Sequence, residues 1–294
     1  MDAGQSGVRL RLDDTLLPEQ PGVRTSLPVI PQLATIARQA LAQAGATTDS
    51  LAIGSTALRA SSSAAELLRQ VAYLGIKRVA LAHDSVTSYL GALSTARGAI
   101  VAAGTGVVTL AVGERAVVRV DGWGNIIGDA GSGFWIGRNG LIAVMRAHDG
   151  RGPATALSKV VQRDFPDIEA AYLDLQNDPG HVSRVAAYAK TISHLAATDP
   201  VCASIVDEAA TELAHSCVVA LRRVGEDGET RFSALGKVFL NSRLRGRFND
   251  LVREALPDAR NVAPQGDGLD GAGMLFTLPE GSPLRGHVSF AEYS

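Results

Sequence analysis

Two short glycine-containing turns that also carry a hydroxyl group are the first candidates for chemistry. One is Asp2-Ala3-Gly4-Gln5-Ser6, and the other is Gly104-Thr105-Gly106, about a hundred residues later. Small residues let backbone N–H groups approach a phosphate, a hydroxyl adds a donor, and a carboxylate can hold Mg²⁺ directly or through water. Each turn alone is more typical of a plain hairpin, in which Gly and Asp serve the backbone conformation. As a pair, one in each half of the chain, they predict a site for nucleotide phosphates between two lobes.

Asp84 is the candidate for proton transfer. It follows the buried strand expected at Val79–Ala82, at the carboxyl end of the strand, where ligands bind in open α/β sheets. A kinase needs a carboxylate there to orient the acceptor hydroxyl and take its proton. The alternative is an N-cap for the helix expected at Ser85–Leu93. The two roles are compatible, and the local sequence by itself favours the cap.

The segment Gly122–Gly133 holds five glycines in twelve residues, together with Trp123 and Asp129. Such a loop can come close to a ligand, with Asp129 accepting hydrogen bonds from sugar hydroxyls and Trp123 shaping the wall of a pocket. A merely flexible loop rarely carries an apolar pair such as Ile126-Ile127 and then caps a helix, so the sequence favours a functional loop. Later in the chain, Gly236-Lys237 at a strand end allows close approach of a flat base, with a simple strand-to-helix turn as an equal alternative.

Strands alternate with helices in both halves, which predicts an α/β fold of two lobes, residues 1–97 and 98–294, the second with a helical insertion. The elements expected from periodicity and capping signals are a strand at 8–12, helices at 33–44 and 61–74, strands at 51–53 and 79–82, three short strands between 99 and 120, a helix from Ser132, a long helix opened by Asp199-Pro200, and the series of strand 231–235, helix 241–256, strand 261–262 and helix from 269.

The composition narrows the class of protein. The chain has 294 residues, 46% of them apolar and 20% charged, with a formal net charge of −2. No apolar run of 18 residues is present, which argues against a membrane span, and the charge predicts no electrostatic grip on nucleic acid. Cys202 and Cys217 lie in helical segments without metal-ligand spacing, and no secretory signal is visible. These features predict a cytoplasmic protein.

In this order the motifs resemble the N-acetylglucosamine kinase and BadF/BadG/BcrA/BcrD ATPase family, within the actin/hexokinase/Hsp70-like superfamily. The most specific match runs from Gly122-Trp123-Gly124 through Gly128-Asp129-x-Gly131-Ser132 to Trp135-Ile136-Gly137. Asp2-x-Gly4-x-Ser6 is similar to the first phosphate motif, Gly104-Thr105-Gly106 to the second, and Gly236-x-Val238-Phe239 to the adenosine-side segment. Gly271-Ala272 resembles the glycine–alanine pair of the terminal helix. The resemblance covers nearly the whole chain.

The resemblance implies two ribonuclease-H-like lobes with a central nucleotide cleft, and an ATP-dependent kinase acting on an amino sugar or related hexose. It implies that Asp84 is the general base and that Asp2 holds Mg²⁺ through water. The residues implied for ATP and Mg²⁺ are Asp2, Gly4, Gln5, Ser6, Gly104, Thr105, Gly106, Gly236, Lys237 and Gly271. Those implied for the sugar are Ser26, Asp84, Gly122, Trp123 and Asp129. The partners expected are ATP and a sugar, with neither nucleic acid nor membrane, and a homodimer is left open.

Three positions depart from the family pattern. Ala130 stands where the family usually has Glu, and Ser26 and Val108 stand where the amino-sugar kinases place an Asn that touches the sugar. These changes leave N-acetylglucosamine, glucosamine and another hexose as alternatives. They also leave open a sensor or degenerate paralogue that binds nucleotide or sugar without turnover.

The start of the chain carries a further expectation. The turn at Asp2–Gly7 should join two strands, yet the sequence suggests only the strand after it. We therefore expect the first strand of the N-terminal lobe to be missing, Asp2 to be a frayed terminal residue, and the natural reading frame to begin several residues upstream. The alternative is a genuine short form that binds nucleotide weakly.

Overall fold

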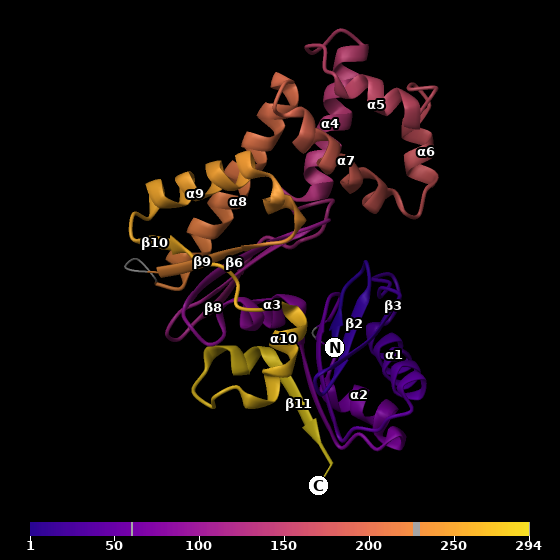
Figure 1. Cartoon of the computed structure of the whole chain (residues 1–294), viewed down its shortest axis with the longest axis vertical. Helices are drawn as coiled ribbons and strands as arrows, with labels where there is room; N and C mark the ends of the chain where they lie inside the picture. Colours follow the sequence, from indigo (N-terminus) through magenta and orange to yellow (C-terminus); the bar gives the residue numbers. More distant parts are fainter. Residues whose placement is uncertain (60, 226–229, 294) are drawn as a thin grey trace. The chain divides into compact units, whose positions relative to one another are not determined.

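The computed structural model describes residues 1–59, 61–225 and 230–293, which divide into two units (Figure 1). Unit 1 comprises Met1–Gly98, Val112–Val117 and Ala263–Ser294, and unit 2 comprises Ala99–Ala111 and Val118–Val262. This division differs from the expected lobes, 1–97 and 98–294, because the last part of the chain returns to unit 1.

The sheet of unit 1 has six strands in the order β11-β5-β4-β1-β2-β3. The bounds are β1 Asp2–Ala3, β2 Val8–Leu12, β3 Thr15–Gln20, β4 Ser50–Ser55, β5 Arg78–His83 and β11 Val288–Glu292. β1, β4 and β5 are parallel, whereas β2, β3 and β11 run antiparallel to their neighbours. Pro18 lies in β3 at the edge of the sheet, where a missing N–H costs no ladder bond. The sequence predicted no strand between 8–12 and 51–53, so β3 was not expected.

The two-residue strand β1 corrects the expectation of a missing first strand. Asp2 pairs with Arg9 of β2 on one side and with Gly54 of β4 on the other. The backbone N of Met1 donates to Ala52 O (2.8 Å), and Gly54 N donates to Met1 O (3.0 Å). Asp2 is therefore held in the sheet by neighbours on both sides and is not frayed.

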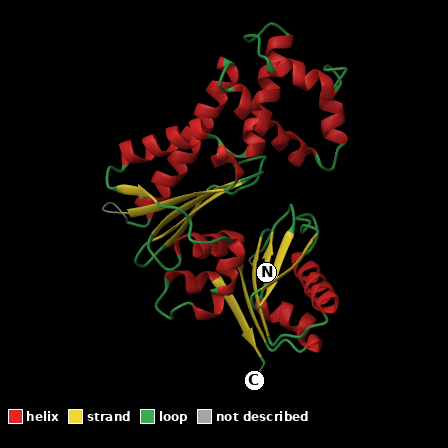
Figure 2. Cartoon of the chain, in the orientation of Figure 1, coloured by secondary structure: helices red, strands yellow, loops and turns green. Residues whose placement is uncertain are grey.

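The helices of unit 1 cover its sheet (Figure 2). They are α1 Val29–Ala44, α2 Ala64–Val71, α3 Asp84–Leu93 and α10 Gly268–Gly273, with the 3-10 turns η1 Ala72–Leu74, η3 Leu275–Thr277 and η4 Pro283–His287. α1 ends at Gly45, whose φ of 59° lies in the left-handed region that favours glycine, as the sequence predicted. Ser63 caps α2 by accepting the backbone N–H of Glu66, within the helix expected at 61–74.

The five strands in the sheet of unit 2 follow the same order as five of the six strands in unit 1. The order in unit 2 is β10-β9-β6-β7-β8, with bounds β6 Gly98–Ala103, β7 Val107–Val112, β8 Val117–Val120, β9 Thr230–Leu235 and β10 Ala259–Asn261. The consecutive strands β6, β7 and β8 lie side by side, as β1, β2 and β3 do in unit 1. The parallel strands β9 and β10 continue the sheet from β6, as β4 and β5 do from β1. The turns Gly4–Gly7 and Gly104–Gly106 therefore occupy corresponding positions, each after the first strand of its sheet. The predicted α/β fold with two sheets is confirmed.

The helices of unit 2 are α4 Gly133–His148, α5 Leu157–Asp164, α6 Ala171–Asn177, α7 His181–Leu195, α8 Pro200–Arg223 and α9 Ser242–Ala255, with the 3-10 turn η2 Lys237–Leu240. Asp199 caps α8 by accepting the N–H groups of Val201 and Cys202, as the Asp-Pro signature predicted. Both cysteines are fully buried, and burial raises the pKa of Cys202 to about 11 and of Cys217 to about 12.

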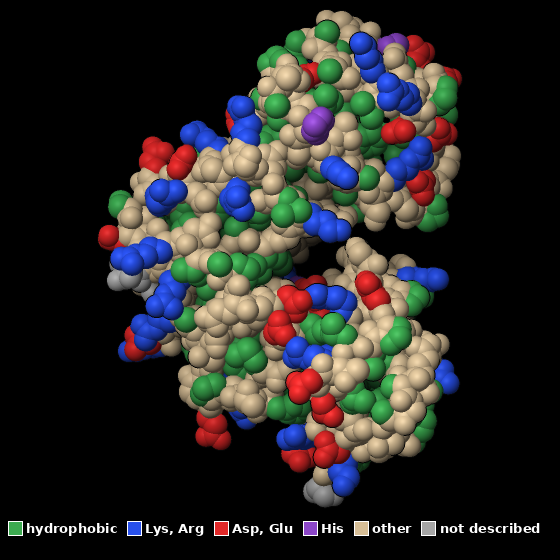
Figure 3. Space-filling model, in the orientation of Figure 1, with side chains coloured by type: hydrophobic (Ala, Val, Ile, Leu, Met, Phe, Trp, Pro, Cys, Tyr) green, Lys and Arg blue, Asp and Glu red, His purple; other side chains and the backbone are tan. Residues whose placement is uncertain are grey.

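The surface carries both signs of charge. On the face shown in Figure 3, basic and acidic side chains are interspersed over both units, consistent with the small net charge. Among the described residues, no helix combines the length and apolar character needed to cross a bilayer.

Candidate functional site

Asp84 is the first residue of α3, directly after β5, as the sequence placed it. The N-cap of α3 is His83, whose Nδ1 accepts the N–H of Ser85 (3.2 Å), so the alternative that Asp84 is the cap is wrong. His83 Nδ1 also lies 2.9 Å from Asp84 Oδ1, and the Asp84 side chain is 29% exposed. Asp84 therefore presents a partly exposed carboxylate at the carboxyl end of a central strand, which suits proton abstraction.

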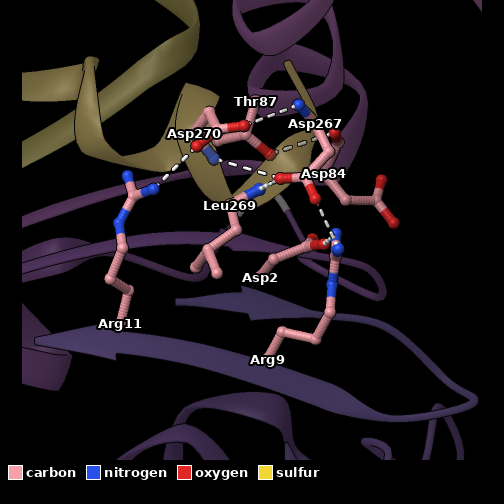
Figure 4. Close-up of polar contacts among 8 residues, drawn as sticks. All are labelled: Asp2, Arg9, Arg11, Asp84, Thr87, Asp267, Leu269 and Asp270. Carbon is pink, nitrogen blue, oxygen red and sulfur yellow. Dashed lines mark hydrogen bonds and ion pairs between the residues drawn. The ribbon is translucent and has the colours of Figure 1, made fainter. Parts of the chain in front are cut away.

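The carboxylates of Asp2 and Asp267 form a cluster around the side chain of Arg9 (Figure 4). The guanidinium of Arg9 lies 2.6 Å from Asp2 and 2.5 Å from Asp267, so one cation bridges two carboxylates. Burial opposes the charge of Arg9, but its hydrogen bonds to Asp2 and Asp267 raise its pKa overall. Asp267 comes from the last part of the chain, and the sequence did not single it out.

The N-terminus of α10 holds Asp267 in place. Asp267 Oδ1 accepts the N–H groups of Leu269 (2.8 Å) and Asp270 (3.2 Å), while Asp270 Oδ2 accepts the N–H of Asp267 (2.9 Å). This reciprocal capping box fixes the start of the helix. Backbone hydrogen bonding from Asp267, followed by the side chain of Arg11, lowers the pKa of Asp270.

Asp2 and Asp267 have the chemistry of a magnesium site. Mg²⁺ prefers oxygen ligands and usually takes one or two protein carboxylates, with waters and substrate phosphates completing its shell. Asp2 and Asp267 converge on the guanidinium of Arg9, each at a different nitrogen, so both carboxylates border the position of one cationic group. Clusters of three or more metal-binding side chains do not occur among the described residues. The pair therefore fits a phosphate-bound Mg²⁺ better than an ion held by protein alone.

The first phosphate turn is a closed loop with exposed polar side chains. Gly4 N donates to Gly7 O (3.1 Å), and Val23 N donates to Gly4 O (3.0 Å). A Cβ on Gly22 would overlap the carbonyl of Gln5, so the segment before α1 packs directly against the turn. Gln5 and Ser6 are exposed at its tip, and Ser26 is exposed in the loop that follows Gly22. The glycines of the turn leave its backbone accessible, as phosphate binding requires.

Gly271 has a packing role that the sequence did not reveal. A Cβ at this position would overlap the carbonyl oxygen of Thr87 and lie 2.6 Å from Gly91 N. Gly271 thus lets α10 lie directly on α3, the helix that begins with Asp84.

In unit 2, the second phosphate turn meets the residue predicted for the sugar. A Cβ on Gly106 would lie 2.6 Å from Asp129 Oδ2, so the carboxylate rests against the backbone of the turn. Asp129 is only 8% exposed and accepts the N–H of Gly124 (3.3 Å). The structure brings together Asp129 and Gly106, which lie more than twenty residues apart in the sequence.

The N-terminus of α4 is joined to the same turn. Gly133 N donates to Gly104 O (2.8 Å) and Phe134 N donates to Thr105 O (3.0 Å). Ser132 caps the helix by accepting the N–H of Trp135 (3.1 Å), as the sequence predicted. The carbonyls of the turn are therefore engaged by α4.

Asp121 organises the glycine-rich loop and was missed at the sequence level. Its carboxylate accepts the N–H groups of Gly122 (2.7 Å), Asp129 (2.8 Å) and Ala130 (2.9 Å). Burial, followed by the charge of Asp121, raises the pKa of Asp129 above its ordinary value. The only local signal was an Asp-Gly pair directly after a strand, which reads as an ordinary turn.

The other predicted sugar residues of the loop are more exposed. Gly122 has a φ of 80°, and a Cβ there would crowd the side chain of Val108 (3.1 Å). Trp123 is 55% exposed, with the guanidinium of Arg119 stacked 4.2 Å from its ring centre. The position of the Trp123 ring is therefore set by a cation–π contact rather than by burial.

The adenosine-side segment packs against the second phosphate turn and opens onto a cavity. Gly236 has a φ of 97°, and a Cβ there would overlap the carbonyl of Ala103, the residue before the turn. Gly104, Thr105 and Lys237 line a cavity of about 810 Å³ within unit 2. That volume is in the range of small-molecule and cofactor sites. Unit 2 thus gathers Gly104–Gly106, Asp129, Gly236 and Lys237, and unit 1 gathers Asp2, Asp84 and the turn Gly4–Ser6.

Comparison with known proteins places these features in a family. The BadF/BadG/BcrA/BcrD ATPase family matches residues 26–275. The N-acetylmuramic acid/N-acetylglucosamine kinase of Clostridium acetobutylicum is 26% identical over 71% of this chain and 70% of its own length. The N-acetyl-D-glucosamine kinase of Dictyostelium discoideum is 40% identical over 22% of this chain and 20% of its own length.

Solved structures show the same fold. A protein from Chromobacterium violaceum is 24% identical with a TM-score of 0.70, over 92% of this chain and 95% of that one. The ROK hexokinase of Thermus thermophilus is 15% identical with a TM-score of 0.53, over 92% of this chain and 94% of that one. The predicted fold of the actin/hexokinase type is confirmed.

Proposed function

Because the chain belongs to the BadF/BadG/BcrA/BcrD ATPase family, we propose that it is an ATP-dependent kinase that transfers the γ-phosphate to a hydroxyl of an amino sugar or related hexose. The observation that carries this proposal is the meeting of Asp129 with the turn Gly104–Gly106. The contact places a carboxylate suited to sugar hydroxyls, Asp129, beside a turn suited to phosphates, Gly104–Gly106, as phosphoryl transfer to a sugar requires.

In unit 2, the nucleotide would occupy the cavity next to Gly104 and Thr105, with Gly236 and Lys237 on its adenosine side. Asp129 would accept hydrogen bonds from the sugar, and Gly122 and the exposed Trp123 would also contact it. A charged hydrogen bond of this kind contributes roughly 1.5–3 kcal/mol.

In unit 1, Asp84 would take the proton of the acceptor hydroxyl as the phosphoryl group transfers. Its position at the start of α3 supports this role, because the helix backbone is already capped by His83 and leaves the carboxylate partly exposed. Gln5 and Ser6 would offer donors to phosphate oxygens, Gly4 would let the phosphate approach the turn closely, and Ser26 would contact the sugar.

Asp2, with Asp267 beside it, would hold Mg²⁺ through water. When bound, the ion neutralises phosphate charge during transfer. Arg9 now bridges the two carboxylates, so we expect it to release at least one of them when Mg²⁺ and nucleotide bind.

The amino-sugar assignment draws on the relatives. Two of them are named as N-acetylglucosamine kinases, and one of these also as an N-acetylmuramic acid kinase. Ser26 and Val108 differ from the asparagines of the amino-sugar kinases, so we keep the substrate class as amino sugars and related hexoses.

The test is ADP release with ATP-Mg²⁺ and a panel of N-acetylglucosamine, N-acetylmuramic acid, glucosamine and glucose. We expect sugar-dependent ADP release with at least one amino sugar, and a thermal shift with ATP. A thermal shift without ADP release for any sugar would contradict the kinase proposal and favour a binding protein without turnover.

A further inference from the structure

One face of α7 forms a wall of the unit 2 cavity. The lining residues from this helix include Ser183, Ala186, Ala187, Lys190, Ser193 and His194, which recur at intervals of three and four along the helix. Such spacing places all six on one side of an α-helix. The first two turns of α7 present small side chains to the cavity, and the last two present a lysine and a histidine. Along α7, the wall of the cavity therefore changes from small uncharged side chains to basic ones.

The opposite face of α7 is fixed in the core of unit 2. Val185, Tyr188 and Ile192 are buried, and Tyr188 Oη donates to Asp164 (2.6 Å). A Cβ on Gly137 of α4 would overlap the carbonyl of Val185, so the two helices lie in direct backbone contact. This packing fixes which side chains of α7 face the cavity.

A polar contact also ties α7 to the far side of the cavity. Asn241 caps α9 by accepting the N–H of Leu244 (3.1 Å), and its Nδ2 donates to Ser193 O on α7 (3.4 Å). Lys190 thus stands in a wall that is fixed relative to the segment holding Lys237.

The cavity has a one-sided charge. Lys190, His194 and Lys237 all line it, and its lining includes no Asp or Glu. Within the described ranges, these three side chains make no ion pair, whereas Arg184 on the same helix pairs with Asp178 and stacks on Phe165. Cations that line a cavity without a protein anion are typical of a site for an anionic ligand.

The remaining lining suits the rest of a nucleotide. Ile136, Val238 and Leu240 add apolar surface to the cavity, and the turn Gly104–Thr105 lies in the same lining. An apolar wall accommodates a flat base, and lysines and open backbone turns accommodate phosphates.

We propose that Lys190, which no sequence motif marked, binds the phosphate chain of the nucleotide and makes affinity depend on the number of phosphates. This inference rests on the proposed function, because it assumes that the nucleotide occupies this cavity. His194, one turn further along α7, adds to the same positive region, and Lys237 supplies its counterpart on η2.

The test compares nucleotide affinities of Lys190→Met with those of the wild-type chain by calorimetry, using ATP-Mg²⁺, ADP-Mg²⁺ and adenosine. We expect about a tenfold loss for ATP, a similar or smaller loss for ADP, and no change for adenosine, since a charged contact is lost. The affinity of Lys190→Met for ATP should also depend less on salt. Lys190→Arg should stay within about threefold of wild type.

Lys159→Met on α5 is the matched control, because Lys159 is an exposed helical lysine outside the cavity lining. It should leave all three affinities unchanged. Equal loss of ATP and adenosine affinity in Lys190→Met would reduce Lys190 to a structural part of the wall, and unchanged ATP affinity would overturn the inference. A wild-type chain that bound neither ATP nor ADP would instead overturn the proposed function.

Discussion

The side chain of Asp84 is not needed to start α3, because its neighbour His83 caps the helix. His83 accepts the N–H of Ser85, so the start of α3 does not depend on the Asp84 side chain. In the sequence, the cap and the general base were two compatible roles for one residue. The structure assigns the cap to the adjacent residue His83.

The Asp84→Asn variant should therefore separate catalysis from folding. We expect phosphoryl transfer to fall by on the order of 10²-fold or more, the usual contribution of general acid–base catalysis, with little change in Tm. The measurements are ADP release with the best sugar and thermal unfolding. Asp258→Asn, at an exposed loop position, should match wild type in both. Unchanged turnover in Asp84→Asn would leave Asp84 with no role in proton transfer.

The buried carboxylate of Asp129 should lower the stability of the fold, and the pH dependence of stability should show this. Burial and then Asp121 raise its pKa, so the neutral acid is favoured in the folded state and ionisation opposes folding. The stability that the group contributes is complete below its unfolded pKa of about 3.9 and is lost as the pH rises through the higher folded value. Asp129 therefore contributes less stability at neutral pH than at a pH below its unfolded pKa.

Asp129→Asn should raise Tm at pH 7, and the gain should shrink as the pH falls toward 4. The Asn side chain keeps an acceptor for Gly124 N and tolerates the positive φ of 59°. Sugar affinity by calorimetry should fall roughly ten- to a hundredfold, while nucleotide affinity holds. A lower Tm at pH 7 would contradict the predicted cost of burying the charge. A loss of nucleotide affinity would assign Asp129 to the other ligand.

The sequence could predict residues that serve a local motif but not those that act across the fold. Asp129 and Gly104–Gly106 stand out through their glycine-rich neighbourhoods. Asp121 and Asp267 have no such signature, because their importance lies in what folding places beside them, namely the loop amides and Arg9. Lys190 likewise has no local signature, because it lines the cavity only once α7 is packed.

Among the elements, α4 and α7 show how a motif glycine serves packing. Gly137 belongs to the segment that carries the family resemblance, and the structure gives it a physical reason, which is the backbone contact with Val185 on α7. The helices that define the cavity wall depend on that close approach.

Gly137→Ala and Gly246→Ala should therefore have opposite effects. The added methyl group at Gly137 forces the helices apart, and overpacking of this kind costs about 1–3 kcal/mol. Gly246 lies in α9 with no atom near its missing Cβ, so Ala should stabilise by about 0.4–1 kcal/mol. Denaturant unfolding of the two variants measures the contrast. Equal stabilities would mean that α4 and α7 can shift without loss.

Elements with strong periodicity or clear caps were predictable, whereas β3 and β11 were not. β3 contains Pro18, and β11 pairs with β5 from the opposite end of the chain. Neither a proline in an edge strand nor a partner far away in the sequence leaves a local pattern. The two-residue β1 is too short for any periodicity and exists because β2 and β4 flank it.

For the whole molecule, the two-sheet α/β architecture was predictable and the division of the chain was not. The sequence suggested a single boundary near residue 98, but α10 and β11 complete unit 1 from the far end of the chain. The same segment brings Asp267 to Arg9.

A chain ending at Val262 should therefore lose the fold of unit 1. Without β11 and α10, β5 becomes an edge strand and α3 loses its packing against Gly271. Hydrogen exchange should show rapid exchange in β4 and β5 and retained protection in β6 and β9. Removing only Tyr293 and Ser294 should leave both sheets protected. Equal protection of β5 in the Val262-ending chain would show that unit 1 folds without its last segment.

The return of the chain to unit 1 also sets an order of events on the ribosome. The first 98 residues emerge early, but they must wait for Ala263–Ser294 before their sheet and helices are complete. At about 5–20 residues per second, synthesis of the intervening stretch takes roughly 10–30 s. During that interval the nascent N-terminal segment exposes the edge of β5 and the bare face of α3, so it is the part of the newborn chain for which chaperones have the longest opportunity to bind.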